Sequence, residues 1–187
     1  MANKGSGFER EIAKELGLWW TDGERDDIFW RTAMSGGRAT VRRKKRVKTE
    51  NSAGDLCYLD PIGKPLIDLL LIEIKRGYSN EVSVLNFLDK AERSKDPVLF
   101  RWWLKAEQER ADAKRKWTVI IFKRDRHEKC IMLEYDFFSK LEQENGEWSS
   151  DEVIDVMYED HNFIIVRYED FFDWLSPQTI INIGKGD

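Results

Sequence analysis

The chain has 187 residues, 41% of them hydrophobic and 12% aromatic, and its formal net charge is −4 at pH 7. This length supports one sizeable core, and the supply of hydrophobic and aromatic residues excludes an intrinsically disordered chain. No window approaches the roughly 20 apolar residues of a transmembrane helix, and the N-terminus lacks the apolar segment of a signal peptide, so we expect a cytoplasmic protein.

The first half of the chain predicts one helix followed by strands. The hydrophobic spacing predicts a helix from Ser6 to about Leu16, with Gly17 as its stop, and a short strand over residues 28–32. A loop over residues 33–53 follows. The segment around Asp55 and residues 70–75 each predict a strand, and the turn residues between them, 60–65, predict a hairpin that joins the two.

The second half alternates helices and strands. We predict helices over about residues 82–93, 96–116, 135–143 and 169–175, and strands over 117–122, 129–133 and 162–167. The strands at 117–122 and 129–133 are expected to pair across a short turn. This order predicts an α/β sandwich with a mixed sheet and helices on its faces.

Charge is distributed unevenly along the chain. Residues 1–133 carry 28 Lys and Arg against 21 Asp and Glu, whereas residues 134–187 carry 3 against 14. The segment from Arg38 to Lys48 holds seven cations and no acid. It is interpreted either as a solvated loop or as an arm that contacts nucleic-acid phosphates. The acidic segment has the alternatives of an ordinary surface, a shield for the basic surface, a mimic of nucleic-acid charge, or a docking site for a protein partner.

Two carboxylates and one lysine form the strongest chemical signal. Glu73 and Lys75 point to the same side of their strand, and the predicted hairpin brings Asp55 to them. A buried charge is costly unless it is paired or bound to a metal. Carboxylates beside a phosphate suit Mg²⁺, with the carbonyl of Ile74 as a further ligand and Lys75 orienting or deprotonating a water. The alternative is a buried ion-pair cluster without chemistry.

Glu9 is a third carboxylate to weigh. On its predicted helix it shares a face with the apolar residues Ile12, Ala13 and Leu16. It therefore leans towards the core, where it is a candidate for the same site. The alternative is a capping box with Ser6, in which Glu9 only satisfies a backbone donor at the helix start.

Several of these segments together resemble a known group. They are Gly5 to Ile12, Arg31, Ser35-Gly36-Gly37, Gly54-Asp55-Leu56 and Ile72-Glu73-Ile74-Lys75. The pattern resembles the PD-(D/E)xK nuclease superfamily, in particular the archaeal Holliday-junction resolvases and related phage or restriction-type nucleases. The resemblance covers about residues 4–76, and more loosely the chain to about residue 134.

The resemblance implies a restriction-endonuclease-like α/β/α sandwich with a central mixed sheet. It also implies catalytic roles for Glu9, Asp55, Glu73 and Lys75, and a Mg²⁺ or Mn²⁺ ion held by Asp55, Glu73, the Ile74 carbonyl and Glu9. Two features depart from the family pattern: Gly54 stands where Pro is usual, and the loop over residues 33–53 is longer. We expect a nuclease-like core over residues 1–134 and a small acidic C-terminal extension over 135–187, packed on the core.

Basic and polar residues near these motifs are the expected DNA contacts. A basic stripe on the helix at 96–116 would meet the DNA backbone, although an ordinary amphipathic helix is the alternative. Related nucleases often have a glutamine on this helix near the metal, which implies such a place for Gln108. The expected DNA-binding residues are Arg31, Ser35, Arg38, Arg42, Arg43, Lys44, Lys45, Arg46, Lys105 and Gln108.

The sequence thus predicts a Mg²⁺-dependent DNA endonuclease that hydrolyses phosphodiester bonds, with branched DNA or Holliday junctions as the substrate implied by the resemblance. The alternatives are a phage or restriction-type nuclease acting on ordinary duplex DNA, and a non-cleaving nucleic-acid-binding module on the same fold. A homodimer is implied because resolvases make two symmetric cuts. A phage-encoded protein would act in the host-cell cytoplasm.

Overall fold

The first helix is longer than predicted. The computed structural model describes residues 4–32, 53–89 and 95–186, and α1 spans Lys4–Trp20. Gly17 does not end this helix. A Cβ atom at Gly17 would lie 3.1 Å from the carbonyl oxygen of Arg25, so glycine here permits the close approach of the following loop. Because the helix begins at Lys4, Ser6 is not its N-cap, and the capping-box interpretation of Glu9 is wrong.

The hairpin predicted for the Asp55 segment is also wrong. Strand β2 (Leu56–Tyr58) pairs antiparallel with β1 (Phe29–Arg31) in a two-stranded sheet of their own. The turn residues that follow β2 instead begin two helices, η1 (Pro61–Gly63) and α3 (Lys64–Leu69). The side chain of Asp60 accepts a hydrogen bond from the amide of Ile62 and so caps η1. Asp-Pro is as good a helix start as a turn, since an N-cap Asp and an early Pro both favour a helix.

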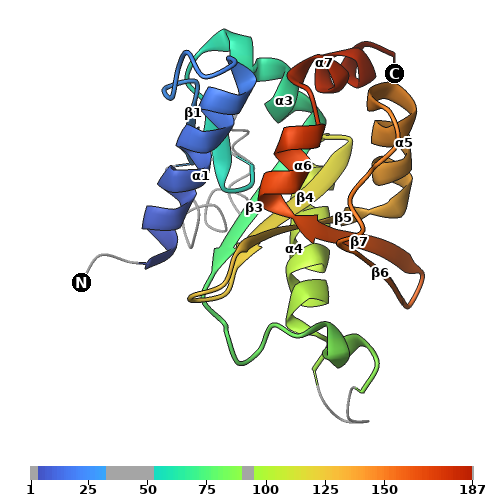
Figure 1. Ribbon diagram of the computed structural model, residues 1–187. Coiled ribbons are helices and arrows are strands. Elements are labelled where there is room, and N and C mark those ends of the chain that lie inside the picture. The colour runs from blue at the N-terminus through green and yellow to red at the C-terminus, as the bar shows by residue number, and fades with distance from the viewer. Residues whose placement is uncertain (1–3, 33–52, 90–94, 187) are drawn as a thin grey trace.

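A five-stranded mixed sheet forms the centre of the fold (Figure 1). Its order is β3-β4-β5-β7-β6, in which β3 and β4 are parallel and the other pairs are antiparallel. The predicted pairing of β4 with β5 is confirmed. The strands are β3 (Leu70–Arg76), β4 (Trp117–Lys123), β5 (Lys129–Glu134), β6 (Val153–Tyr158) and β7 (His161–Arg167).

The remaining helices are α4 (Val98–Ala113), α5 (Tyr135–Asn145), α6 (Tyr168–Trp174) and α7 (Pro177–Gly186). The helix predicted over residues 82–93 is wrong in its described part, where only the 3-10 turn η2 (Val84–Phe87) forms. Ser83 caps this turn by accepting from the amide of Leu85. In the described parts of the chain, no helix is both long enough and apolar enough to cross a membrane.

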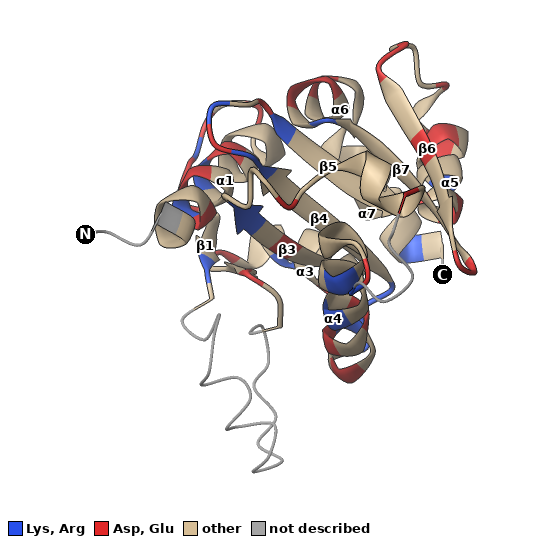
Figure 2. Cartoon of the chain, turned by 90° about the horizontal axis from the view of Figure 1, so that it is seen from below, with Lys and Arg blue, Asp and Glu red and all other residues tan. Residues whose placement is uncertain are grey.

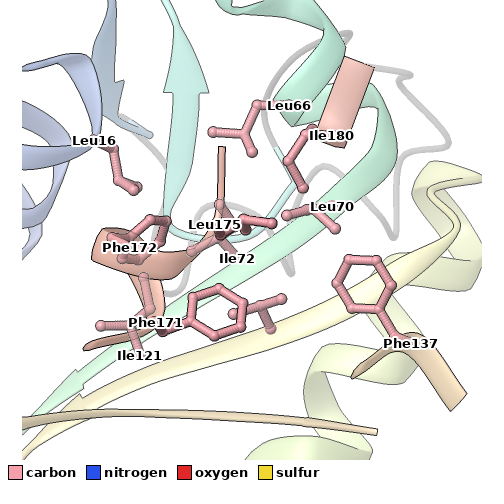
Figure 3. A pocket seen from close by; sticks show the side chains of 11 residues that line it. Leu16, Leu66, Leu70, Ile72, Ile121, Phe137, Phe171, Phe172, Leu175 and Ile180 are labelled. Carbon is pink, nitrogen blue, oxygen red and sulfur yellow. The ribbon is translucent and has the colours of Figure 1, made fainter. Parts of the chain in front are cut away.

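Helices cover both faces of the sheet, which confirms the predicted α/β/α sandwich. On one face α4 and η2 pack on β4, β5 and β7 through residues such as Trp103, Ile120 and Phe163. On the other face α1, α3, α5, α6 and α7 enclose the larger core. Side chains from several of these helices converge with Ile72 and Ile121 on a small pocket that is lined only by apolar residues (Figure 3). This pocket is part of the core.

The acidic C-terminal segment is built into the same sheet. Residues 135–187 supply β7, which lies between β5 and β6, and three helices of the larger core. Its acidic residues therefore lie on the outside of elements whose apolar residues complete the core. Figure 2 shows Asp and Glu gathered around β6 and α5, at the end of the sheet away from β3.

Candidate active site

Gly54 brings Asp55 to the edge of the main sheet. Among the strands of the described residues, β3 pairs only with β4, so its other edge is open to the segment before β2. The amide of Asp55 donates to the carbonyl of Ile72 at 2.9 Å. Gly54 has φ +69°, and a Cβ atom there would lie 2.7 Å from the same Ile72 oxygen. Glycine is required twice, because the backbone is left-handed and the two segments nearly touch.

Two buried polar side chains hold this segment in place. Thr32 donates from its hydroxyl to the carbonyl of Gly54 at 2.8 Å, and its amide donates to the carbonyl of Asp55 at 3.0 Å. Arg115 donates through Nη1 to the carbonyl oxygens of Ala53 at 3.0 Å and Leu70 at 3.2 Å. The guanidinium thus ties the segment before Asp55 to the start of β3.

Asp55, Glu73 and Lys75 meet at this edge. The Oδ2 atom of Asp55 accepts from the amide of Ile74 at 2.8 Å and from Lys75 Nζ at 3.2 Å. Lys75 Nζ lies 2.5 Å from Glu73 Oε1. Both carboxylates are buried, at 5% and 1% residue exposure. One ammonium therefore bridges a carboxylate of β3 and a carboxylate from the segment that precedes β2.

Lys105 of α4 adds a second cation from the facing layer. Its Nζ atom lies 3.2 Å from the same Oε1 atom of Glu73 that binds Lys75. Glu73 points towards α4 because its neighbour on β4, Ile120, belongs to the core beneath that helix. The sequence predicted Lys105 as a DNA contact, and the structure places it at the rim of the carboxylate cluster.

Glu9 and Arg31 lie beside the cluster. Arg31 Nη1 is 3.3 Å from Glu9 Oε2, and Arg31 is paired with Leu56, the residue after Asp55. The charge of Glu9 makes a small contribution to the raised pKa of Asp55. No group of three or more Asp, Glu, His or Cys residues within the described ranges is arranged to hold a metal. Glu9 thus lies outside the Asp55–Glu73 pair.

Burial and neighbouring charges shift the pKa values of the two carboxylates in opposite directions. Burial, and then the charge of Glu73, raise the pKa of Asp55 to about 6. Burial acts in the same direction on Glu73, but Lys75 and Lys105 outweigh it and lower the Glu73 pKa. Burial would lower the pKa of Lys75, yet the two carboxylates outweigh it and raise that pKa. Glu73 has two ammonium partners and Asp55 shares one of them, so the charge of Asp55 is the less well compensated of the two.

This donor set fits a hard divalent cation. The described hydrogen bonds and ion pairs of the two carboxylates all fall on Asp55 Oδ2 and Glu73 Oε1. Their second oxygens, together with the carbonyl of Ile74 on the free edge of β3, supply oxygen ligands of the kind that Mg²⁺ and Mn²⁺ take. Lys75 Nζ lies 3.4 Å from that carbonyl. The cluster can hold a cation beside an ammonium, as phosphoryl chemistry requires.

Other predicted contacts lie elsewhere. The Gln108 amide donates to Asp112 at 3.4 Å, one turn further along the exposed side of α4. Ser35, Arg38, Arg42, Arg43, Lys44, Lys45 and Arg46 lie outside the described residues.

Sequence reasoning missed Thr32 and Arg115. Arg115 lies within the range 96–116 that the sequence predicts as a basic, amphipathic helix. It follows Lys114, whose left-handed backbone ends α4 and turns the chain inward. A positively charged residue directly after a helix end, before a strand, was the only signal for it.

Comparison with protein families gives a match over nearly the whole chain. A family described as "Phage putative PDDEXK endonuclease" matches residues 1–182. No curated protein and no solved structure matches the chain. The family match spans the Asp55 and Glu73 segments as well as the C-terminal strands of the sheet. The predicted superfamily is confirmed, and the chain belongs to this phage family of PD-(D/E)xK endonucleases.

Proposed function

We propose that this protein is a divalent-metal-dependent DNA endonuclease whose reaction takes place at Asp55, Glu73 and Lys75. The observation that carries the proposal is the pair of buried carboxylates that share the Lys75 ammonium at the free edge of β3. The pKa of Asp55 is raised to about 6, first by burial and then by Glu73, because the ionised carboxylate is costly in this buried position. A bound divalent cation would stabilise the ionised form.

In this proposal some residues would hold the metal ion, and Lys75 would stabilise negative charge on the phosphate. Asp55, Glu73 and the Ile74 carbonyl hold the cation, which when bound supplies Lewis-acid stabilisation of charge on the phosphoryl oxygens. Lys75, held between the two carboxylates, donates hydrogen bonds to the phosphate and orients the attacking water. Because its pKa is raised against the effect of burial, we assign Lys75 to charge stabilisation rather than to proton abstraction.

Cations on two sides of the cluster would meet the DNA backbone. Arg31 lies on the α1 side, where Glu9 holds it, and Lys105 lies on the α4 side. Phosphate contacts of this kind position DNA without reading its sequence. Within DNA, we propose branched molecules as the preferred substrate, on the resemblance to junction resolvases, with ordinary duplex DNA as the alternative. As a phage nuclease it would act in the host-cell cytoplasm.

The test is a cleavage panel of supercoiled, linear duplex, single-stranded, forked and four-way DNA with Mg²⁺, Mn²⁺ or EDTA. We expect cleavage only with metal, and a loss of about 100-fold or more in Asp55→Asn and in Glu73→Gln. Asp26→Asn is the matched control, since Asp26 pairs with Lys14 on the surface. Unchanged cleavage by the two site variants would place the chemistry elsewhere. Salt-dependent DNA binding with no product under any metal would favour the non-cleaving module.

A further inference from the structure

Glu73 carries two ammonium groups on one oxygen. Lys75 Nζ lies 2.5 Å and Lys105 Nζ 3.2 Å from Glu73 Oε1. Lys75 is shared with Asp55, so Lys105 is the second cation that balances the two carboxylates. It comes from a different layer of the fold, from α4 instead of β3.

The two lysines differ in how firmly they are held. The Lys75 side chain is 19% exposed and also contacts Asp55, whereas the Lys105 side chain is 62% exposed. The other described ion-pair partner of Lys105 is Glu109, which lies 3.6 Å away and one turn along α4. The Lys105 ammonium is largely in solvent, and Glu73 keeps the Lys75 ammonium when Lys105 leaves, so Lys105 is the more easily released of the two cations. If Lys75 moved away, both buried carboxylates would lose an ammonium partner.

We propose that Lys105 is an exchangeable counter-ion of Glu73 that couples metal binding to DNA binding. In the metal-free protein its ammonium neutralises Glu73. When a divalent cation binds between Asp55 and Glu73, Lys105 is released to a phosphate of the bound DNA. This inference rests on the proposed function of the same site, and it adds an order of events and a regulatory role for one residue.

Two opposite effects follow from this exchange. Without DNA, the Lys105 ammonium on Oε1 repels a cation held by the second oxygen of Glu73 and so weakens metal binding. With DNA, a phosphate draws Lys105 away and this repulsion disappears. Each ligand therefore strengthens the binding of the other, and this coupling is reciprocal in free energy. A lysine that only contacted DNA would have no effect on metal binding in the absence of DNA.

The first test measures metal binding without DNA. Mn²⁺ and Mg²⁺ are titrated by calorimetry into wild type, Lys105→Met and Arg101→Met. Arg101 is the matched control because it lies one turn earlier on α4 and pairs with Glu81 instead of Glu73. We expect Lys105→Met to bind metal roughly three- to five-fold more tightly, the size of an exposed ion pair, and Arg101→Met to match wild type.

The second test measures DNA affinity by fluorescence anisotropy, in EDTA and in Ca²⁺, on DNA shown intact by gel. We expect Lys105→Met to lose little affinity in EDTA, where Lys105 is held by Glu73, and several-fold more in Ca²⁺. Equal losses in both conditions would make Lys105 an ordinary phosphate contact and overturn the exchange.

The outcomes separate this inference from the proposed function. If wild type and Lys105→Met bind metal with equal affinity, the exchange is overturned while the metal site stands. If neither protein binds a divalent cation without DNA, the exchange is overturned, and the cleavage panel with metal decides the proposed function separately.

Discussion

The amide of Asp55 donates a 2.9 Å hydrogen bond to the carbonyl of Ile72, and the amide of Ile74 returns a 2.8 Å bond to the Asp55 carboxylate. These two bonds dock the small β1–β2 sheet on the free edge of β3. Asp55 therefore reaches the site through a docked segment and not through a regular strand ladder. Residues that hold this segment should control the site without contacting DNA.

Gly54 is the most sensitive of these residues. Gly54→Ala adds a Cβ atom 2.7 Å from the Ile72 oxygen at a backbone φ of +69°, so the Asp55 segment must move. We expect a loss of about 2–4 kcal/mol in unfolding free energy, from the left-handed backbone and the contact together, and weaker metal binding. Urea unfolding and calorimetry measure the two effects.

Gly23→Ala provides the matched control. Gly23 has φ +85°, but a Cβ atom there would meet nothing within 4 Å. It should show only the backbone cost, about 1 kcal/mol, with metal affinity unchanged. Equal destabilisation of the two variants would show that the contact with Ile72 does not constrain Asp55.

Arg115 should matter more for the site than for overall stability. Burial lowers the pKa of its guanidinium to about 10, which shows that the charge is costly where it lies. Arg115→Met removes this cost but also removes the donors to the Ala53 and Leu70 carbonyls. The two effects oppose each other, so we expect a stability change of about 1 kcal/mol or less.

The activity of Arg115→Met should fall by about ten-fold or more, because the Asp55 segment is no longer tied to β3 and small displacements are costly in catalysis. Single-turnover cleavage and metal titration of Arg115→Met and the control Arg101→Met measure this. A large loss of stability with normal metal affinity would contradict the positioning role.

The residue pattern predicted which residues form the site better than it predicted how the elements that carry them pair and connect. Glu73 and Lys75 follow an apolar run with strand alternation, and this local pattern sufficed to place both on one face of β3. The partner of β2 was not predictable, because Asp60-Pro61 can begin a turn or a helix and the choice depends on packing. Strand β6 was missed because its apolar residues, such as Ile154 and Met157, remain exposed at the sheet edge among acids. Helix α7 was missed because its glycines weaken the helical pattern.

The raised pKa of Asp55 predicts that the site destabilises the fold near neutral pH. Burial and Glu73 raise this pKa from 3.8 to about 6. As the pH rises from about 4 to about 6, Asp55 ionises in the unfolded chain while it stays protonated in the folded one. The unfolding free energy that this group contributes therefore falls across that window and stays low above it.

Asp55→Asn should remove this pH-dependent loss. In EDTA near pH 8 we expect the variant to be more stable than wild type, by up to about 3 kcal/mol, with the difference vanishing near pH 4. Urea unfolding of both proteins across this range checks the prediction. A stability difference of the same size near pH 4 and near pH 8 would show that ionisation of Asp55 does not destabilise the folded protein.

The central claim is that Lys75 stabilises charge at a metal-dependent phosphodiester-cleaving site. Its most direct test is the single-turnover cleavage rate of wild type and Lys75→Met at saturating Mg²⁺, with metal and DNA binding measured in parallel. We predict a fall of about 100-fold or more in rate while the variant still binds both ligands. A Lys75→Met protein that binds metal and DNA and cleaves at the wild-type rate would contradict the account.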